Sequence, residues 1–193
     1  RNGAALHRSC RVTAIAREAE GFAVTTSGGV FRGRFIINAA GVHAGEVHEL
    51  IGEKNFTIRP VKGEYYLLDK SEGGRVARTI FQCPSAAGKG VLAAPTVHGN
   101  LIVGPTADPS APDDVSNTAG GMEAVRTLAL RSVPGIRFRE NIRNFAGVRA
   151  NSDRGDFILE ESPSAPGFFN AAGICSPGLS AAPAIARYLA ELM

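Results

Sequence analysis

The residues best suited to chemistry lie where the last strand of the sequence turns into the last helix. Residues 168–173 (FFNAAG) have the pattern of a buried strand, and residues 174–178 (ICSPG) lead into an apolar helix. Gly173 and Gly178 let the backbone approach a ligand closely, and the free N–H groups and dipole of a helix N-terminus favour negative charge. Pro183 fits this helix if it lies in the first turn. The same pattern is also typical of an ordinary tight connection.

Arg149 is the second candidate, at the end of the apolar segment FAGVR (145–149). A guanidinium in this position could present paired N–H donors to a carboxylate or a phosphate. Alternatively, Arg149 is a surface residue paired with Asp153 or Asp156, and the residues alone leave both interpretations open.

The third candidate is the segment KGEYY, residues 62–66. Neighbouring side chains of a strand point to opposite faces, so only one of Tyr65 and Tyr66 can face a pocket. The alternative is a buried tyrosine that donates to a backbone carbonyl. We assign no catalytic role to the histidines, because their spacing to Ser, Cys or carboxylate residues builds no triad.

The composition excludes several classes of protein. The net charge of +3 is dispersed and gives no nucleic-acid-binding stripe, so a small anion is the more suitable partner. The cysteines have no metal-ligand spacing, and we expect reduced thiols and a cytoplasmic protein, with peripheral membrane association left open. No apolar run reaches the roughly 20 residues of a membrane helix. There is neither a GxGxxG after a strand nor a Walker-type loop, so the usual grip on a dinucleotide pyrophosphate is missing.

The elements that must position these residues alternate between two patterns. The first part predicts a strand over 5–16 and a hairpin over 21–32 that turns at 27–29. A strand buried on both faces of a parallel sheet is expected at 35–37, followed by a helix at 44–51. The sequence begins with RNGA, which is typical of a helix ending at a glycine, so we expect that it has lost its beginning.

From Thr57 the pattern is β-rich. We expect a strand over 57–69, interrupted at Pro60 and Gly63. Further strands are expected at 79–81, 91–94 and 101–104, followed by a loop over 105–117. An amphipathic helix over 122–133 then ends before Pro134. The last part predicts strands at 142–148, 157–160 and 168–171 and a final helix over 179–193. This order predicts a β-rich insertion, about 56–145, between two pieces of an α/β domain.

Taken together, these segments resemble the D-amino-acid-oxidase-like family of FAD-dependent oxidoreductases, in the branch of glycerol-3-phosphate dehydrogenases and L-2-hydroxyglutarate oxidases. The resemblance covers essentially the whole chain and rests on segments in the family's order: FIINAAG (35–41), IRPVKGEYY (58–66), PTVHGNLIVGPT (95–106), GVR (147–149) and AGICSPGLS (172–180). It implies a mixed α/β (α+β) fold. A partial Rossmann-like FAD-binding domain (1–55 and 146–193) would enclose an inserted antiparallel, β-rich substrate domain (56–145).

The resemblance also implies roles for individual residues. Val12 would contact the adenine through its backbone, and Ala40 and Gly41 would lie along the adenosine and pyrophosphate. Arg149 would bind the carboxylate or phosphate of the substrate, and Tyr65 would face the substrate. The flavin's pyrimidine edge would be surrounded by Gly173, Ile174, Gly178, Leu179 and Ser180.

The implied reaction is hydride transfer from a carbon bearing a hydroxyl or amine to flavin N5, with oxygen, a quinone or a protein as the electron acceptor. Tyr65 stands where better-known glycerol-3-phosphate dehydrogenases have a histidine, so the catalytic base is unassigned. Because the glycine-rich loop is missing from this sequence, we expect its own FAD affinity to be weak or absent. The alternatives are amine oxidation at the same arginine, and a non-catalytic binding or interaction module.

Overall fold

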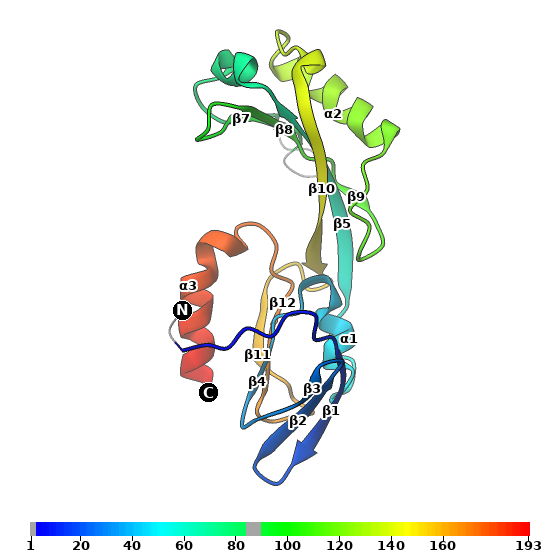
Figure 1. The fold of residues 1–193 in the computed structure, drawn as a ribbon, viewed down its shortest axis with the longest axis vertical. Coiled ribbons are helices and arrows are strands. Elements are labelled where there is room, and N and C mark those ends of the chain that lie inside the picture. The colour runs from blue at the N-terminus through cyan, green and yellow to red at the C-terminus, as the bar shows by residue number, and fades with distance from the viewer. Residues whose placement is uncertain (1–2, 84–89) are drawn as a thin grey trace. The chain divides into compact units, whose positions relative to one another are not determined.

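The computed structural model describes residues 3–83 and 90–193. The chain divides into a first unit, Arg1–Arg59 with Ala150–Met193, and a second unit, Pro60–Arg149 (Figure 1). The chain crosses between them within strands β5 (Ile58–Leu68) and β10 (Asn141–Ser152). The expected insertion, 56–145, begins and ends four residues before the second unit (56 against 60, 145 against 149).

The first sheet of the first unit is an antiparallel hairpin with a third strand. It has the order β1-β2-β3, with bounds Val12–Glu18, Gly21–Thr26 and Gly29–Gly33. The hairpin predicted at 27–29 is confirmed. The strand predicted over 5–16 is wrong in its first half, because the pairing with β2 begins at Val12 opposite Thr26 and gives no partner strand to residues 5–11.

The second sheet of the first unit has the order β11-β12-β4, with bounds Ile158–Glu161, Phe168–Ala172 and Ile36–Asn38. β12 is buried over its whole length and runs parallel to β4, as predicted. The expectation that β4 is buried on both faces is wrong. Among the described residues β4 pairs only with β12, at the edge of the sheet, and Ile37 is 46% exposed.

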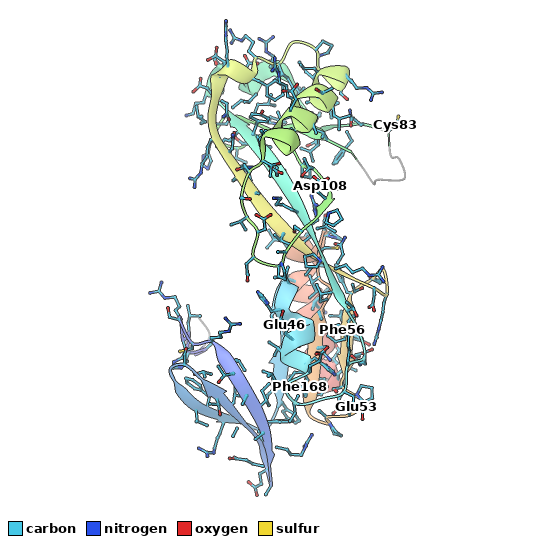
Figure 2. The ribbon with its side chains drawn as sticks, turned by 90° about the vertical axis from the view of Figure 1, so that its right-hand side faces the viewer. Glu46, Glu53, Phe56, Cys83, Asp108 and Phe168 are labelled. Atoms are coloured by element: carbon cyan, nitrogen blue, oxygen red, sulfur yellow. The ribbon has the colours of Figure 1, made fainter. Side chains whose placement is uncertain are left out.

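A buried polar network joins the two parallel strands to helix α1 (Ala44–His48), which follows a 3₁₀ turn, Gly41–His43. Asn38 Nδ2 donates to Asn170 Oδ1 at 3.0 Å, so Asn170 Nδ2 faces His48 Nδ1, also at 3.0 Å. His48 Nε2 then donates to the carbonyl of Glu53 at 3.0 Å. The His48 ring packs edge-on against Phe56 and Phe168, which Figure 2 labels beside α1. His48 is therefore a structural residue.

The second unit is built on a mainly antiparallel sheet with the order β10-β5-β8-β7-β6. Its other strands are β6 (Ile80–Phe81), β7 (Leu92–Pro95) and β8 (Leu101–Gly104). The short strand β9 (Asp108–Pro109) pairs with β5. The interruptions of β5 expected at Pro60 and Gly63 are wrong. Pro60 still accepts the N–H of Ser110 through its carbonyl at 3.2 Å, and Gly63 is where a side chain from β10 lies across the strand.

Helix α2 (Ala119–Ser132) packs Val125 and Ala129 against one face of this sheet, in a core with Leu68, Leu101 and Val103. The buried carboxylate of Glu64 accepts the N–H of Thr118, the N-cap residue, at 2.6 Å. A carboxylate is well suited to the positive end of a helix. The helix and its end before Pro134 are as predicted.

Helix α3 (Gly178–Leu192) closes the chain and packs Leu189 against Phe169 and Ala171. Pro183 is its sixth residue, so the expectation that it lies in the first turn is wrong. The carbonyl of Leu179 consequently lacks its usual helical donor, which solvent can replace because Leu179 is 95% exposed. The helix end expected at residues 1–4 falls partly outside the described residues. Within the described part of the chain, no helix is long and apolar enough to cross a membrane.

Candidate functional site

Two candidate segments of the first unit meet at one edge of the β11-β12-β4 sheet. Phe168 pairs with Ile36 and Asn170 with Asn38 in parallel register. The carboxyl ends of β4 and β12 therefore open on the same side, where open α/β sheets bind their ligands. Ala40 and Gly41 follow β4 there, and Gly173 and Ile174 follow β12. The residues at this edge are Asn38, Ala40, Gly41, Ala172, Gly173 and Ile174.

Gly173 is required by its surroundings at this edge. Its φ is +66°, and a Cβ there would lie 2.8 Å from the Cβ of Ser152 and 3.1 Å from the carbonyl oxygen of Asp156. A cavity of about 350 Å³ borders the same turn, lined by Asn151, Ser152, Gly155, Asp156, Phe157, Gly173, Cys175, Ser176 and Pro177. The turn after β12 is thus tightly packed on one side and open on the other.

The N-terminus of α3 offers unused donors beside this turn. The N–H of Gly178 donates to Cys175 O at 2.6 Å, and Ser180 Oγ donates to Pro177 O at 2.9 Å. Among the described residues, the backbone N–H groups of Leu179 and Ser180 have no acceptor. Gly178 is buried against Ile174, and a side chain at this position would clash with it. These donors suit an electron-rich ligand edge.

Val12 belongs to the other sheet of the first unit. It starts β1, in the β1-β2-β3 sheet, and its side chain packs on the core of Ile15, Phe22 and Phe168. The structure therefore brings together the other cofactor candidates and places Val12 in the β1-β2-β3 sheet of the same unit.

Arg149, in the second unit, lies over a glycine of the neighbouring strand. A Cβ on Gly63 would be 2.5 Å from Nη2 of Arg149 and 2.8 Å from the Cβ of Pro105, so only a glycine leaves room for the guanidinium. Both Nη atoms donate to the carbonyl of Thr106, each at 3.3 Å. Within the described part of the second unit, Arg149 forms no ion pair, so its other N–H donors remain available.

Tyr65 shares this face of the sheet with Arg149. Its ring stacks on Phe145 at 5.1 Å between centroids, with 8° between the ring planes. Side chains alternate along a strand, so Gly63 and Tyr65 of β5 share a face, and so do Phe145 and Arg149 of β10. Tyr66 points the other way and packs on Phe138 at the edge of the core. A Cβ on Gly147, between Phe145 and Arg149, would meet nothing within 4 Å.

A second cavity of the second unit, about 650 Å³, lies near α2 and includes three arginines in its lining. Each of them already has a carboxylate partner. The pairs are Arg126–Glu123 at 3.6 Å, Arg137–Glu72 at 2.6 Å and Arg139–Glu140 at 3.2 Å. This cavity therefore has less free positive charge than its arginine content suggests. In the described ranges, no group of three or more His, Cys, Asp or Glu could hold a metal ion.

Comparisons with known proteins identify the family. The family model described as FAD dependent oxidoreductase (DAO) matches residues 1–192. The chain belongs to this family. It is 42% identical over its whole length to a glycerol 3-phosphate dehydrogenase of Caloramator mitchellensis, of which it covers 40%. FAD is thus the cofactor of the family to which this chain belongs.

Two solved structures share the fold of this chain. L-alpha-glycerophosphate oxidase of Mycoplasma pneumoniae, with FAD bound, aligns with a TM-score of 0.86 at 29% identity, covering 95% of this chain and 50% of that one. Glycine oxidase of Geobacillus kaustophilus aligns at 0.81 and 25% identity, covering 98% and 49%. The chain therefore spans half or less of the length of these relatives. The mixed α/β fold predicted from the sequence is confirmed.

Sequence reasoning missed several residues that position the candidates. Gly63 was expected to interrupt a strand, although a glycine inside a strand also marks a place where another group approaches closely. Thr106 and Glu64 lie in segments that carry the family resemblance, but neither was assigned a role, because their importance depends on which loop and which helix end lie over β5.

Proposed function

We propose that the protein containing this chain is an FAD-dependent oxidoreductase that oxidises a small anionic alcohol of the glycerol-3-phosphate or 2-hydroxy-acid type. The single observation that carries this proposal is the Arg149 guanidinium, fixed over Gly63 with donors to spare. The 42% identity to a glycerol 3-phosphate dehydrogenase supports the same substrate class.

The described residues fit the flavin of this family. The turn after β12 has no side chain at Gly173 or Gly178, and the N–H groups of Leu179 and Ser180 lack acceptors among the described residues. A bound FAD would supply the hydride-accepting chemistry for oxidation of the substrate carbon. The N–H groups at the start of α3 would stabilise negative charge at its pyrimidine edge. Ala40 and Gly41 would lie along the adenosine and pyrophosphate, and Val12 would contact the adenine through its backbone.

On the substrate side, Arg149 holds the phosphate or carboxylate by charge-assisted hydrogen bonds. Tyr65 forms an aromatic wall with Phe145 beside the substrate carbon. The proton of the substrate hydroxyl goes to a base that we leave unassigned, and the electrons pass on to oxygen, a quinone or a protein.

Activity and substrate binding can be tested on the protein expressed from the reading frame that contains these 193 residues. We expect flavin absorbance at about 450 nm and oxidation of glycerol 3-phosphate or a 2-hydroxy acid, with oxygen or an artificial electron acceptor. Arg149→Met should raise KM about 10- to 100-fold, since a charge-assisted hydrogen bond contributes about 1.5–3 kcal/mol. Arg143→Met, an exposed arginine of the same strand, is the matched control.

Amine oxidation is the second candidate, supported by the TM-score of 0.81 with a glycine oxidase. Preferential turnover of glycine or other amino acids over alcohols would establish it. A protein without flavin absorbance or turnover would indicate a non-catalytic binding module and contradict the proposal.

A further inference from the structure

We propose that the segment of residues 105–118, here called the strap, positions the Arg149 guanidinium for its anion, and that Thr106 is the positioning residue. This inference rests on the proposed role of Arg149 as the anion-binding residue. It adds a second set of residues, which do not touch the substrate but decide how tightly the anion is held.

The first observation is that Thr106 contacts both β5 and Arg149. Its hydroxyl accepts the N–H of Glu64 at 3.2 Å, and its carbonyl accepts both Nη atoms of Arg149 at 3.3 Å. Thr106 is only 8% exposed. One residue therefore links the backbone of β5 to the orientation of the guanidinium. An arginine held on one edge in this way keeps its other N–H donors aimed in a fixed direction.

The second observation is that the strap is fixed to β5 beyond Thr106. β9 pairs Asp108 with Lys62 in the sheet, and the N–H of Ser110 donates to Pro60 O at 3.2 Å. Further along, the Lys62 ammonium, with a side chain only 6% exposed, forms an ion pair with Asp114 at 2.7 Å. Figure 2 labels Asp108 on this segment beside the sheet.

The far end of the strap is fixed by Glu64. Its buried carboxylate accepts the N–H of Thr118 at 2.6 Å and the hydroxyl of Thr118 at 2.9 Å. It also accepts from Asn117 Nδ2 at 3.4 Å. Lys62 and Glu64 point to the face of β5 opposite Gly63 and Tyr65. Lys62 and Glu64 thus hold the later part of the strap on one face of β5, and its first residues, Pro105 and Thr106, lie beside Gly63 and Arg149.

Both partners of the strap's ion pair are charged at neutral pH. The hydrogen bond from Lys62 is the main cause that lowers the pKa of Asp114 to about 2. The same hydrogen bond raises the pKa of Lys62 above its usual value, against the opposing effect of burial. Around neutral pH the ion pair between Lys62 and Asp114 is therefore a constant support of the strap and not a pH switch.

The test compares Thr106→Val, Thr106→Ser and the matched control Thr127→Val, a threonine exposed on α2. Two readouts are used with the flavin-containing protein: inorganic phosphate binding by calorimetry, and KM and kcat for the anionic substrate. Thr106→Val leaves the buried N–H of Glu64 without its acceptor. We expect the phosphate Kd and the KM to rise about tenfold, with kcat and flavin absorbance within about twofold of wild type. Thr106→Ser and Thr127→Val should resemble wild type.

An unchanged phosphate Kd and KM in Thr106→Val would overturn the inference, as would an equal effect of Thr106→Ser. If Thr106→Val does not fold, Asp114→Asn decides. This variant removes the ion pair with Lys62 but keeps the acceptor for Ser116. It should raise the phosphate Kd about threefold, and wild-type affinity would contradict the proposal. A wild-type protein that binds phosphate but oxidises no substrate would refute the proposed function and leave the strap to be judged on phosphate binding.

Discussion

At the scale of single residues, the candidate substrate site depends on a glycine that does no chemistry. Arg149 could not lie across β5 if residue 63 had a side chain, because a Cβ there would be 2.5 Å from Nη2 and 2.8 Å from Pro105. The arginine itself was visible in the sequence. Its environment, the glycine below it and the Thr106 carbonyl beside it, was not, because the three residues are far apart along the chain.

Gly63→Ala should therefore weaken anion binding. We expect the KM for the anionic substrate to rise about tenfold, since the guanidinium must move away from the Thr106 carbonyl. Flavin absorbance should not change. Gly74→Ala is the matched control in the same unit, because a Cβ there would meet nothing within 4 Å. Measured KM values decide, and an unchanged KM in Gly63→Ala would mean that the guanidinium can shift without cost.

At the scale of elements, the second unit is held together by buried carboxylates at places where the chain changes direction. Glu72, in the 3₁₀ segment Lys70–Arg75, is fully buried. It accepts from Arg75 Nε at 2.9 Å and from the N–H and Nε of Arg137 at 3.0 and 2.6 Å. Burial raises the pKa of Glu72, but the hydrogen bonds from Arg75 and Arg137 outweigh it and lower the pKa to about 2.

This network predicts how stability depends on acid. The folded-state pKa of Glu72 lies below its ordinary value of 4.5, so its contribution is complete above about pH 4.5 and is lost as the pH falls through about 2. Glu72→Gln should lower the melting temperature at pH 7 and flatten its decline between pH 5 and 2. Thermal melts of wild type and variant across this range test the effect. Glu123→Gln, exposed on α2, is the control. If the melting temperatures of wild type and Glu72→Gln decline in parallel with falling pH, Glu72 does not have this role.

Most elements could be predicted from the sequence because their patterns are local. The hairpin of β2 and β3, the helix α2 and the buried strand β12 each follow from alternation, helical spacing or an apolar run. The errors share a cause in tertiary structure. Residues 5–11 lack a partner strand, β4 lies at a sheet edge, and β5 continues through Pro60 because a carbonyl there can still accept a hydrogen bond.

At the scale of the whole molecule, the proposed site residues fall into two groups. The cofactor candidates belong to the first unit, and Arg149 and Tyr65 belong to the second. Each unit has buried clusters of its own, around Phe168 in the first unit and around Leu101 and Val125 in the second. We therefore expect substitutions in one unit to leave the binding property of the other unit unchanged.

The 193-residue chain expressed alone should retain little FAD, since none of its residues form a GxGxxG loop to hold the pyrophosphate. Absorbance after gel filtration with added FAD measures this. The protein from the complete reading frame is the positive control, and in that protein Gly173→Ala should lower flavin retention because of the contact with Ser152. Stoichiometric FAD on the 193-residue chain would show that the missing loop is dispensable.

The amino-acid sequence alone was enough to identify the strand-to-helix junction at Gly173 as a candidate site, Arg149 as a candidate anion-binding residue, and the family resemblance. These depend on residue types and short spacings, which are local properties. Only the tertiary structure decided that β4 and β12 bring Ala40 and Gly173 to one sheet edge, and that Gly63 and Thr106 fix Arg149. These pairings join residues 43 to 133 positions apart (149 − 106 = 43, 173 − 40 = 133), and strand order and register, which local patterns do not encode, create them.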